Sequence, residues 1–122
     1  MTGTTRKLTS CMKKCTVSFG DVVLVPIPWA DKDIGSKIRP AVVISREKLQ
    51  DAGLVIVLGI SSKELARENE YQIVNWEKAG LKKRSKIWLS KPYAINVKYA
   101  KKIGSLNADE LLYIYRQFLS LI

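Results

Sequence analysis

The sequence of 122 residues contains no histidine and only two cysteines. A histidine general base, a Cys-His dyad and a histidine-containing zinc site are therefore excluded within this chain. Cys11 and Cys15 have the spacing of half a zinc site, but two thiolates cannot supply the four ligands of a structural zinc ion. We expect no metal and no other cofactor. Both cysteines are interpreted as incidental, with oxidation between chains as the alternative.

Long apolar runs are also missing. The longest covers residues 54–60, only seven positions, whereas a helix that crosses a bilayer needs roughly 20 apolar residues. No apolar stretch follows Arg6 and Lys7, so we expect no secretory signal, no membrane association and a cytoplasmic location. The length fits one domain, which we place at residues 19–122 behind a flexible basic tail at residues 1–18.

Acidic residues are scarce, and one long segment has none. The chain has 21 Lys and Arg against 11 Asp and Glu, and residues 78–102 contain nine basic residues and no acidic one. Trp88, Tyr93 and Tyr99 are interleaved with these bases. Cations can bind phosphates and aromatic rings can stack on unpaired bases, so the pattern indicates a nucleic-acid partner. The alternative is an ordinary solvated basic surface.

Short β-type segments dominate the chain after Phe19. The strand at residues 22–25 is expected to end at Pro26, because proline cannot donate to a central ladder. Residues 41–45 and 54–60 have the composition of buried strands. Further strands are predicted at residues 71–74, 85–89 and 94–97, and a short helical turn is predicted at residues 76–79.

The last segment changes to helical periodicity. Asn107 followed at the third position by Glu110 is an Asn-led variant of the capping box. Apolar side chains then recur at helical spacing at Leu111, Tyr115, Phe118 and Ile122. The sequence therefore predicts a mainly β, mixed α+β domain, built as a small barrel or strongly curved sheet with a C-terminal amphipathic helix.

Four strings occur in a characteristic order: Gly-Asp-Val-Val-Leu-Val at 20–25, Ile-Arg-Pro-Ala-Val-Val-Ile at 38–44, Gly-Ile-Ser-Ser at 59–62 and Ile-Gly-Ser-Leu at 103–106. Together they resemble the PemK/MazF toxins of bacterial toxin-antitoxin pairs, over residues 19–122. The resemblance implies an SH3-like barrel with a terminal helix, a homodimer, and an antitoxin partner with an acidic disordered segment. It also implies an endoribonuclease that cleaves single-stranded RNA sequence-specifically without a metal, by attack of the 2′-hydroxyl.

The resemblance also implies site residues. The family's catalytic Arg, before Pro, and its catalytic Thr, after the third strand, fall on Arg39 and Ser61. A guanidinium can bind two phosphate oxygens at once, and Ser61 keeps the hydroxyl of the family's Thr. The residues expected to bind RNA are Trp29, Lys37, Ser62, Lys63, Lys82, Lys83, Arg84, Lys86 and Lys91.

One segment departs from the family pattern. Many members have an acidic residue, then Gln, then Arg-Thr-Ile-Asp, in a later strand, whereas this chain has Ser-Lys-Pro-Tyr-Ala-Ile-Asn at residues 90–96. Ser90 replaces a carboxylate that serves as general base in some members, and Tyr93 replaces the Arg. Two alternatives therefore stay open: a non-catalytic nucleic-acid-binding module on the same barrel, and a gyrase-targeting toxin like CcdB.

Overall fold

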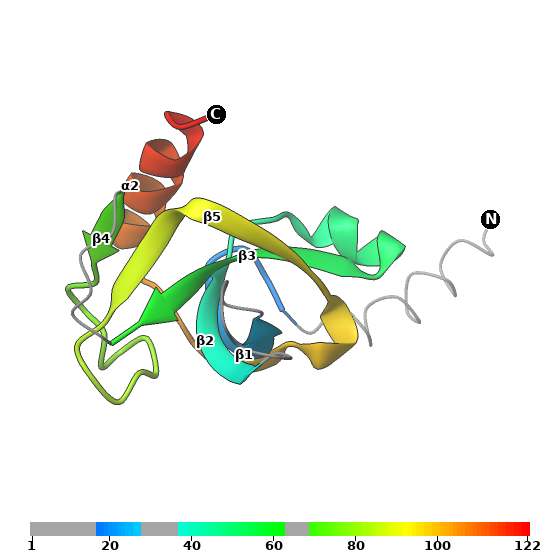
Figure 1. Cartoon of the computed structure of the whole chain (residues 1–122), viewed down its shortest axis with the longest axis horizontal. Helices are drawn as coiled ribbons and strands as arrows, with labels where there is room; N and C mark the ends of the chain where they lie inside the picture. The colour runs from blue at the N-terminus through cyan, green and yellow to red at the C-terminus, as the bar shows by residue number, and fades with distance from the viewer. Residues whose placement is uncertain (1–16, 28–36, 63–68) are drawn as a thin grey trace.

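The computed structural model describes residues 17–27, 37–62 and 69–122 (Figure 1). These residues form one six-stranded antiparallel sheet, two short 3-10 helices (Glu47–Ala52 and Val97–Tyr99) and the helix α2 (Ala108–Leu119). The strands are β1 (Asp21–Ile27), β2 (Lys37–Val43), β3 (Leu54–Ser61), β4 (Glu70–Gln72), β5 (Lys86–Asn96) and β6 (Lys101–Ser105). Most of the expected tail lies outside the described residues.

The expected α+β architecture is confirmed, as a curved sheet that does not close. The strand order is β4-β5-β3-β2-β1-β6, and every neighbouring pair is antiparallel. β4 and β6 lie at the two ends of this order and are not paired with each other in the described part of the chain. Figure 1 shows β3 and β5 arching over β1 and β2, with α2 at one end of the arch.

Three prolines lie inside strands, which corrects the prediction that the first strand ends at Pro26. Pro26 pairs only with β2, Pro40 only with β1, and Pro92 only with β3. At each of these positions one edge of the strand has no partner in the described residues. A missing N–H is tolerated there, because no ladder bond on that edge needs it.

Other bounds also differ from the sequence prediction. The two strands predicted at residues 85–89 and 94–97 are one continuous strand, β5. Its pairing with β3 shifts register between Leu58 and Ile60. β2 begins at Lys37 rather than at residue 41, and β4 is limited to Glu70–Gln72. The expected helical turn at residues 76–79 is present as a single turn and is not a regular helix: the Ala79 N–H donates to the Asn75 carbonyl, four residues earlier, at 3.1 Å.

Strand alternation divides the apolar side chains between the two faces of the sheet. The first cluster includes the cross-strand row Val22, Val42 and Leu58, and Ile114 of α2 packs into it. The second cluster lies on the opposite face, around Val43 and Val57. The helix therefore covers one face only, as its amphipathic pattern predicts.

The predicted cap of α2 is confirmed, but its acidic residue acts elsewhere. The Asn107 side chain accepts a hydrogen bond from the Glu110 N–H at 2.9 Å. The buried Glu110 carboxylate instead accepts from the Tyr71 hydroxyl at 2.8 Å and from the N–H groups of Val74 and Asn75 at 2.6 and 3.3 Å. Burial, and then the bond to Glu110, raise the pKa of Tyr71, so its hydroxyl stays a donor. The start of α2 is thereby tied to the chain that follows β4.

Replacement of this carboxylate tests the tie. We expect Glu110→Gln to lower the free energy of unfolding by about 1 to 3 kcal/mol, because an amide cannot accept all three bonds and a buried donor is left without a partner. Asp109→Asn is the matched control, since Asp109 is exposed in the same helical turn and should change stability by no more than about 1 kcal/mol. Urea denaturation followed by circular dichroism measures both, and equal losses would contradict this role of Glu110.

Candidate functional site

The ladder between β2 and β3 stops before either strand ends. Its last pair is Ala41 with Gly59, although β2 begins at Lys37 and β3 runs to Ser61. Arg39 and Ser61 each lie two residues beyond that pair. Strand alternation gives Arg39 the face of Ala41 and Ser61 the face of Gly59, so both side chains lie on the same face of the sheet, and both line one pocket. The two residues that the family resemblance assigned to catalysis are brought together at this gap.

A pocket of about 440 Å³ opens where the two strands diverge. Its apolar part comes from β1, β2, β3 and β6, and its polar part consists of hydroxyl and cationic side chains. None of the described residues that line it is acidic. The lining consists of Leu24, Arg39, Pro40, Ile60, Ser61, Ser62, Gly80, Leu81, Lys82, Lys83, Ser85 and Ile103. Such a pocket is suited to an anion with an apolar part.

The pocket gathers some of the predicted site residues and leaves others out. Those in its lining are Arg39, Ser61, Ser62, Lys82 and Lys83. Those described but outside its lining are Lys37, Arg84, Lys86 and Lys91. Trp29 and Lys63 lie outside the described residues.

Two glycines hold the wall that bears Lys82 and Lys83. A Cβ on Gly80 would collide with the carbonyl oxygen of Ile103, and one on Gly104 would collide with that of Ala79. Only glycines allow this approach of two backbones, and Gly80 also has a φ of +90°. The turn at residues 76–80 is therefore packed directly against β6. This close approach gives a physical reason for the glycine in the Ile-Gly-Ser-Leu string.

Ser85 is a site residue that the sequence interpretation missed. It is buried in the pocket wall, and its hydroxyl donates to the Lys83 carbonyl at 2.8 Å. The bond fixes the segment that presents Lys83. Its sequence position between basic residues gave no signal of this hydrogen bond.

β5 extends the row of cations beyond the pocket. Lys86 pairs directly with Ser61, and its Nζ lies 3.7 Å from the Glu70 carboxylate on β4. Lys91 Nζ lies 5.6 Å from the centre of the Trp88 ring and 5.8 Å from that of Tyr93. Both lysines are therefore oriented by neighbours, and Glu70 was not anticipated from the sequence.

The segment that departs from the family pattern has its own structural roles. Ser90 is exposed and is not part of the pocket lining. Tyr93 packs against the second cluster, opposite Val57, with its hydroxyl buried. The Asn96 side chain accepts from the Lys98 N–H at 3.0 Å and caps the short helix that follows. These residues serve packing and capping, and none of them supplies a carboxylate to the pocket.

The described residues lack both a cluster of metal ligands and a membrane-spanning helix. They contain no group of three or more His, Cys, Asp or Glu side chains placed to hold a metal ion. None of the helices in this part of the chain has the length and apolar character needed to span a bilayer.

A sequence model of the family described as PemK-like, MazF-like toxin of type II toxin-antitoxin system matches residues 18–122. The chain belongs to this family. The resemblance carried by the four strings is thereby confirmed. A comparison with curated protein sequences finds no match.

Solved structures of MazF toxins share the fold. A crystal structure of MazF from Deinococcus radiodurans superposes with a TM-score of 0.68 at 16% identity, covering 86% of this chain and 94% of that one. An endoribonuclease from a mycobacterial species, in complex with its cognate antitoxin, superposes with a TM-score of 0.65 at 9% identity, covering 87% of this chain and 93% of that one. The Mycobacterium tuberculosis toxin MazF-mt6 superposes with a TM-score of 0.62 at 18% identity, covering 82% of this chain and 96% of that one. At these identities the likeness establishes the fold.

The cationic lining of the pocket makes a prediction about binding. Charge reversal of Lys82 and Lys83 together should weaken binding of single-stranded RNA and reduce the log-log salt slope by about 1.4, or about 0.7 for each phosphate that is no longer neutralised. Lys48 and Lys98 provide a control pair with the same change in net charge, since both are exposed and lie near the opposite end of β3. Fluorescence anisotropy over a salt series measures the slopes, and equal effects of the two pairs would place the RNA elsewhere.

Proposed function

We propose that this PemK/MazF-family chain is the toxin of a toxin-antitoxin pair and cleaves single-stranded RNA without a metal. The observation that supports this most directly is that Arg39 and Ser61 line the same pocket, whose described lining holds three cations and no carboxylate. The endoribonuclease activity named for mycobacterial proteins of the same fold is consistent with it.

The reaction places defined demands on the site. The 2′-hydroxyl attacks the adjacent phosphorus, the bond to the 5′-oxygen breaks, and a 2′,3′-cyclic phosphate and a 5′-hydroxyl result. Donors aimed at the phosphate oxygens lower the barrier, because negative charge builds up there in the transition state. Arg39 can bind two of these oxygens through its planar fork, and the Ser61 hydroxyl donates to the same phosphate. Lys82 and Lys83 would then bind the neighbouring phosphates.

Proton transfer is the weaker part of this site. The chain has no histidine, the described pocket lining has no carboxylate, and a guanidinium remains protonated in proteins. In this proposal the proton of the 2′-hydroxyl passes to water, and water supplies the proton that the 5′-oxygen takes up as it leaves. The fixed donors, Arg39 first among them, therefore account for most of the rate acceleration.

Substitution of Arg39 tests the proposal. Loss of one preorganised donor costs about 10²- to 10³-fold in rate in other enzymes, so Arg39→Ala should remove most turnover. RNA binding should be largely retained, because it is spread over several lysines. Ser61→Ala should cost less, and Ser61→Thr should be tolerated. Arg46→Ala, an exposed arginine just before the 3-10 helix Glu47–Ala52 and outside the pocket lining, is the control.

The assay is cleavage of a mixed-sequence RNA in the presence of chelator, with the new ends mapped. Cleavage by Arg39→Ala at the rate of the parent protein, a requirement for magnesium, or 5′-phosphate products would each contradict the proposed chemistry. Binding without cleavage by the parent protein would support the non-catalytic nucleic-acid-binding module instead.

We further propose a homodimer and an antitoxin partner. Solved structures of the same fold include a MazE-MazF complex from Deinococcus radiodurans, which supports an antitoxin. The acid-free lining of the described pocket suits an acidic, disordered segment that folds on binding. For the homodimer, the support is a set of exposed apolar side chains on and after α2. They are Leu112, Tyr113, Leu119, Leu121 and Ile122.

The antitoxin proposal predicts competition at the pocket. A small acidic protein encoded beside this chain should bind it and block RNA access, and the Lys82 and Lys83 charge reversal should weaken that binding. Isothermal titration with and without a saturating single-stranded RNA measures the competition. Tight binding that leaves RNA affinity unchanged would show that the antitoxin does not cover Arg39.

A further inference from the structure

A strip of polar and aromatic side chains lies on the face of the sheet that α2 does not cover. Ile60 of β3 and Ile87 of β5 point into the first cluster, beneath α2. Because successive side chains alternate between faces, their neighbours point the other way. The strip consists of Lys37 and Arg39 on β2, Ser61 on β3, and Lys86 and Trp88 on β5.

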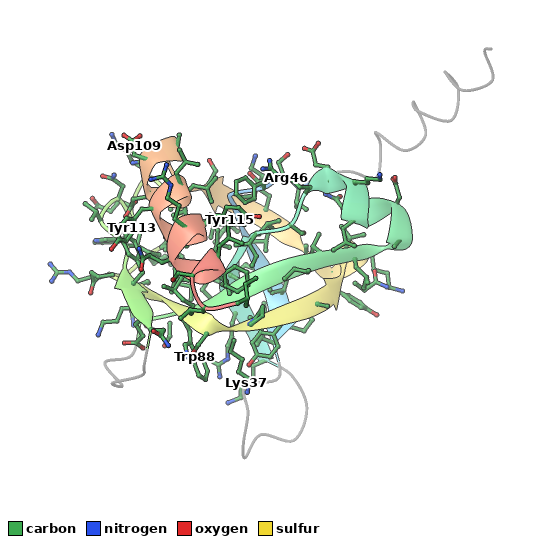
Figure 2. The ribbon with its side chains drawn as sticks, turned by 90° about the horizontal axis from the view of Figure 1, so that it is seen from above. Lys37, Arg46, Trp88, Asp109, Tyr113 and Tyr115 are labelled. Carbon is green, nitrogen blue, oxygen red and sulfur yellow. The ribbon has the colours of Figure 1, made fainter. Side chains whose placement is uncertain are left out.

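Figure 2 agrees with this placement, since the labelled Trp88 and Lys37 project from the side of the molecule opposite Asp109 at the start of α2. Ser61 pairs with Lys86 on one side, and on the other side it faces the gap, beyond which Arg39 lies. Adjacent strands are about 4.8 Å apart, and Trp88 lies two residues beyond Lys86 on the same face. Trp88 therefore lies about 8 Å from Ser61, measured between Cα atoms.

The local shape of β5 presents the Trp88 ring. Ile87 pairs with Ile60 and Pro92 with Leu58, so the residues between them include extra positions that bulge from the ladder. A bulge re-aims the side chains that it carries. Trp88 is half-buried at the start of this bulge, and it pairs with Glu70 on its other edge.

Two lysines flank the ring. Lys91 Nζ lies 5.6 Å from its centre, and Lys86 is held by Glu70 at 3.7 Å. An aromatic ring between cations is the arrangement by which proteins hold single-stranded nucleic acid: the ring stacks on a base and the cations neutralise the adjoining phosphates.

We propose that Trp88 stacks on one base of the RNA beside the phosphate at Arg39 and Ser61, with Lys86 and Lys91 on the flanking phosphates. The inference rests on the proposed function, which it deepens by assigning a base-binding position. Stacking is tolerant of base identity, so Trp88 contributes to affinity over many sequences and leaves the chemical step unchanged. Its substitution therefore raises KM and leaves kcat near that of the parent protein.

The test measures binding of a mixed-sequence 10-nucleotide RNA that is 2′-O-methylated throughout and so cannot be cleaved by 2′-hydroxyl attack. Trp88→Leu should weaken binding about tenfold, whereas Trp88→Phe, which keeps a ring, should stay within about threefold. Tyr99→Leu is the matched control, because Lys98 Nζ lies 5.2 Å from the Tyr99 ring in the same kind of pair. That pair adjoins the Leu54 end of β3, about 23 Å from Ser61, and its loss should leave affinity unchanged.

Abasic substitution locates the base. An abasic nucleotide is placed at each position of the RNA in turn. At one position it should remove the difference in RNA affinity between the parent protein and Trp88→Leu. Two results would overturn the inference: equal affinities of the Leu and Phe variants, or a loss in Trp88→Leu no greater than in Tyr99→Leu. Neither result depends on cleavage. The nuclease activity is tested in a separate assay with unmodified RNA, so its failure can be distinguished from a failure of this inference.

Fluorescence provides a second measurement if Trp88→Leu does not fold. Binding of the methylated RNA should quench the tryptophan emission of the parent protein, and the quenching should be largely lost in Trp88→Phe. Equal fractional quenching in the two proteins would overturn the inference, since the quenched tryptophan would then be another one.

Discussion

The site depends on the separation of β2 from β3 after the Ala41–Gly59 pair. Pro40 occupies the next position of β2 and has no N–H to offer to β3. Arg39 and Ser61 consequently face a gap in the sheet rather than a continuous ladder. In a regular ladder the two strands would lie about 4.8 Å apart at this point, and no pocket would open between them.

The remaining elements keep the gap in shape. The glycines at positions 80 and 104 let the turn before Leu81 rest against the backbone of β6, which fixes one wall. The buried Glu110 ties α2 to the segment after β4, and α2 in turn covers the first apolar cluster. Backbone packing, an apolar cluster and one buried carboxylate thus hold the site, whose exposed lysines themselves add little to stability.

The sequence was sufficient for features with a local signal. The cap at Asn107 and the helical spacing after it located α2, and the resemblance of short strings singled out Arg39 and Ser61, which line one pocket in the structure. Features that depend on distant partners could not be predicted. Proline positions were misjudged because one-sided pairing cannot be read from local sequence, β5 was divided because a bulge interrupts its alternation, and Glu110 found its partners at Tyr71 and Val74, more than thirty residues away.

The order of the strands has a consequence for synthesis of the protein. β1 pairs with β6, so Asp21 can pair only after Ser105, 84 residues later in the chain, has been synthesised. Ile103 of β6 also forms part of the pocket wall. Pairings of such long sequence separation form late, and they require the C-terminal strand to have left the ribosome. A nascent chain or a product truncated before β6 therefore lacks the pocket. The topology itself delays formation of the pocket until nearly the whole chain has been made.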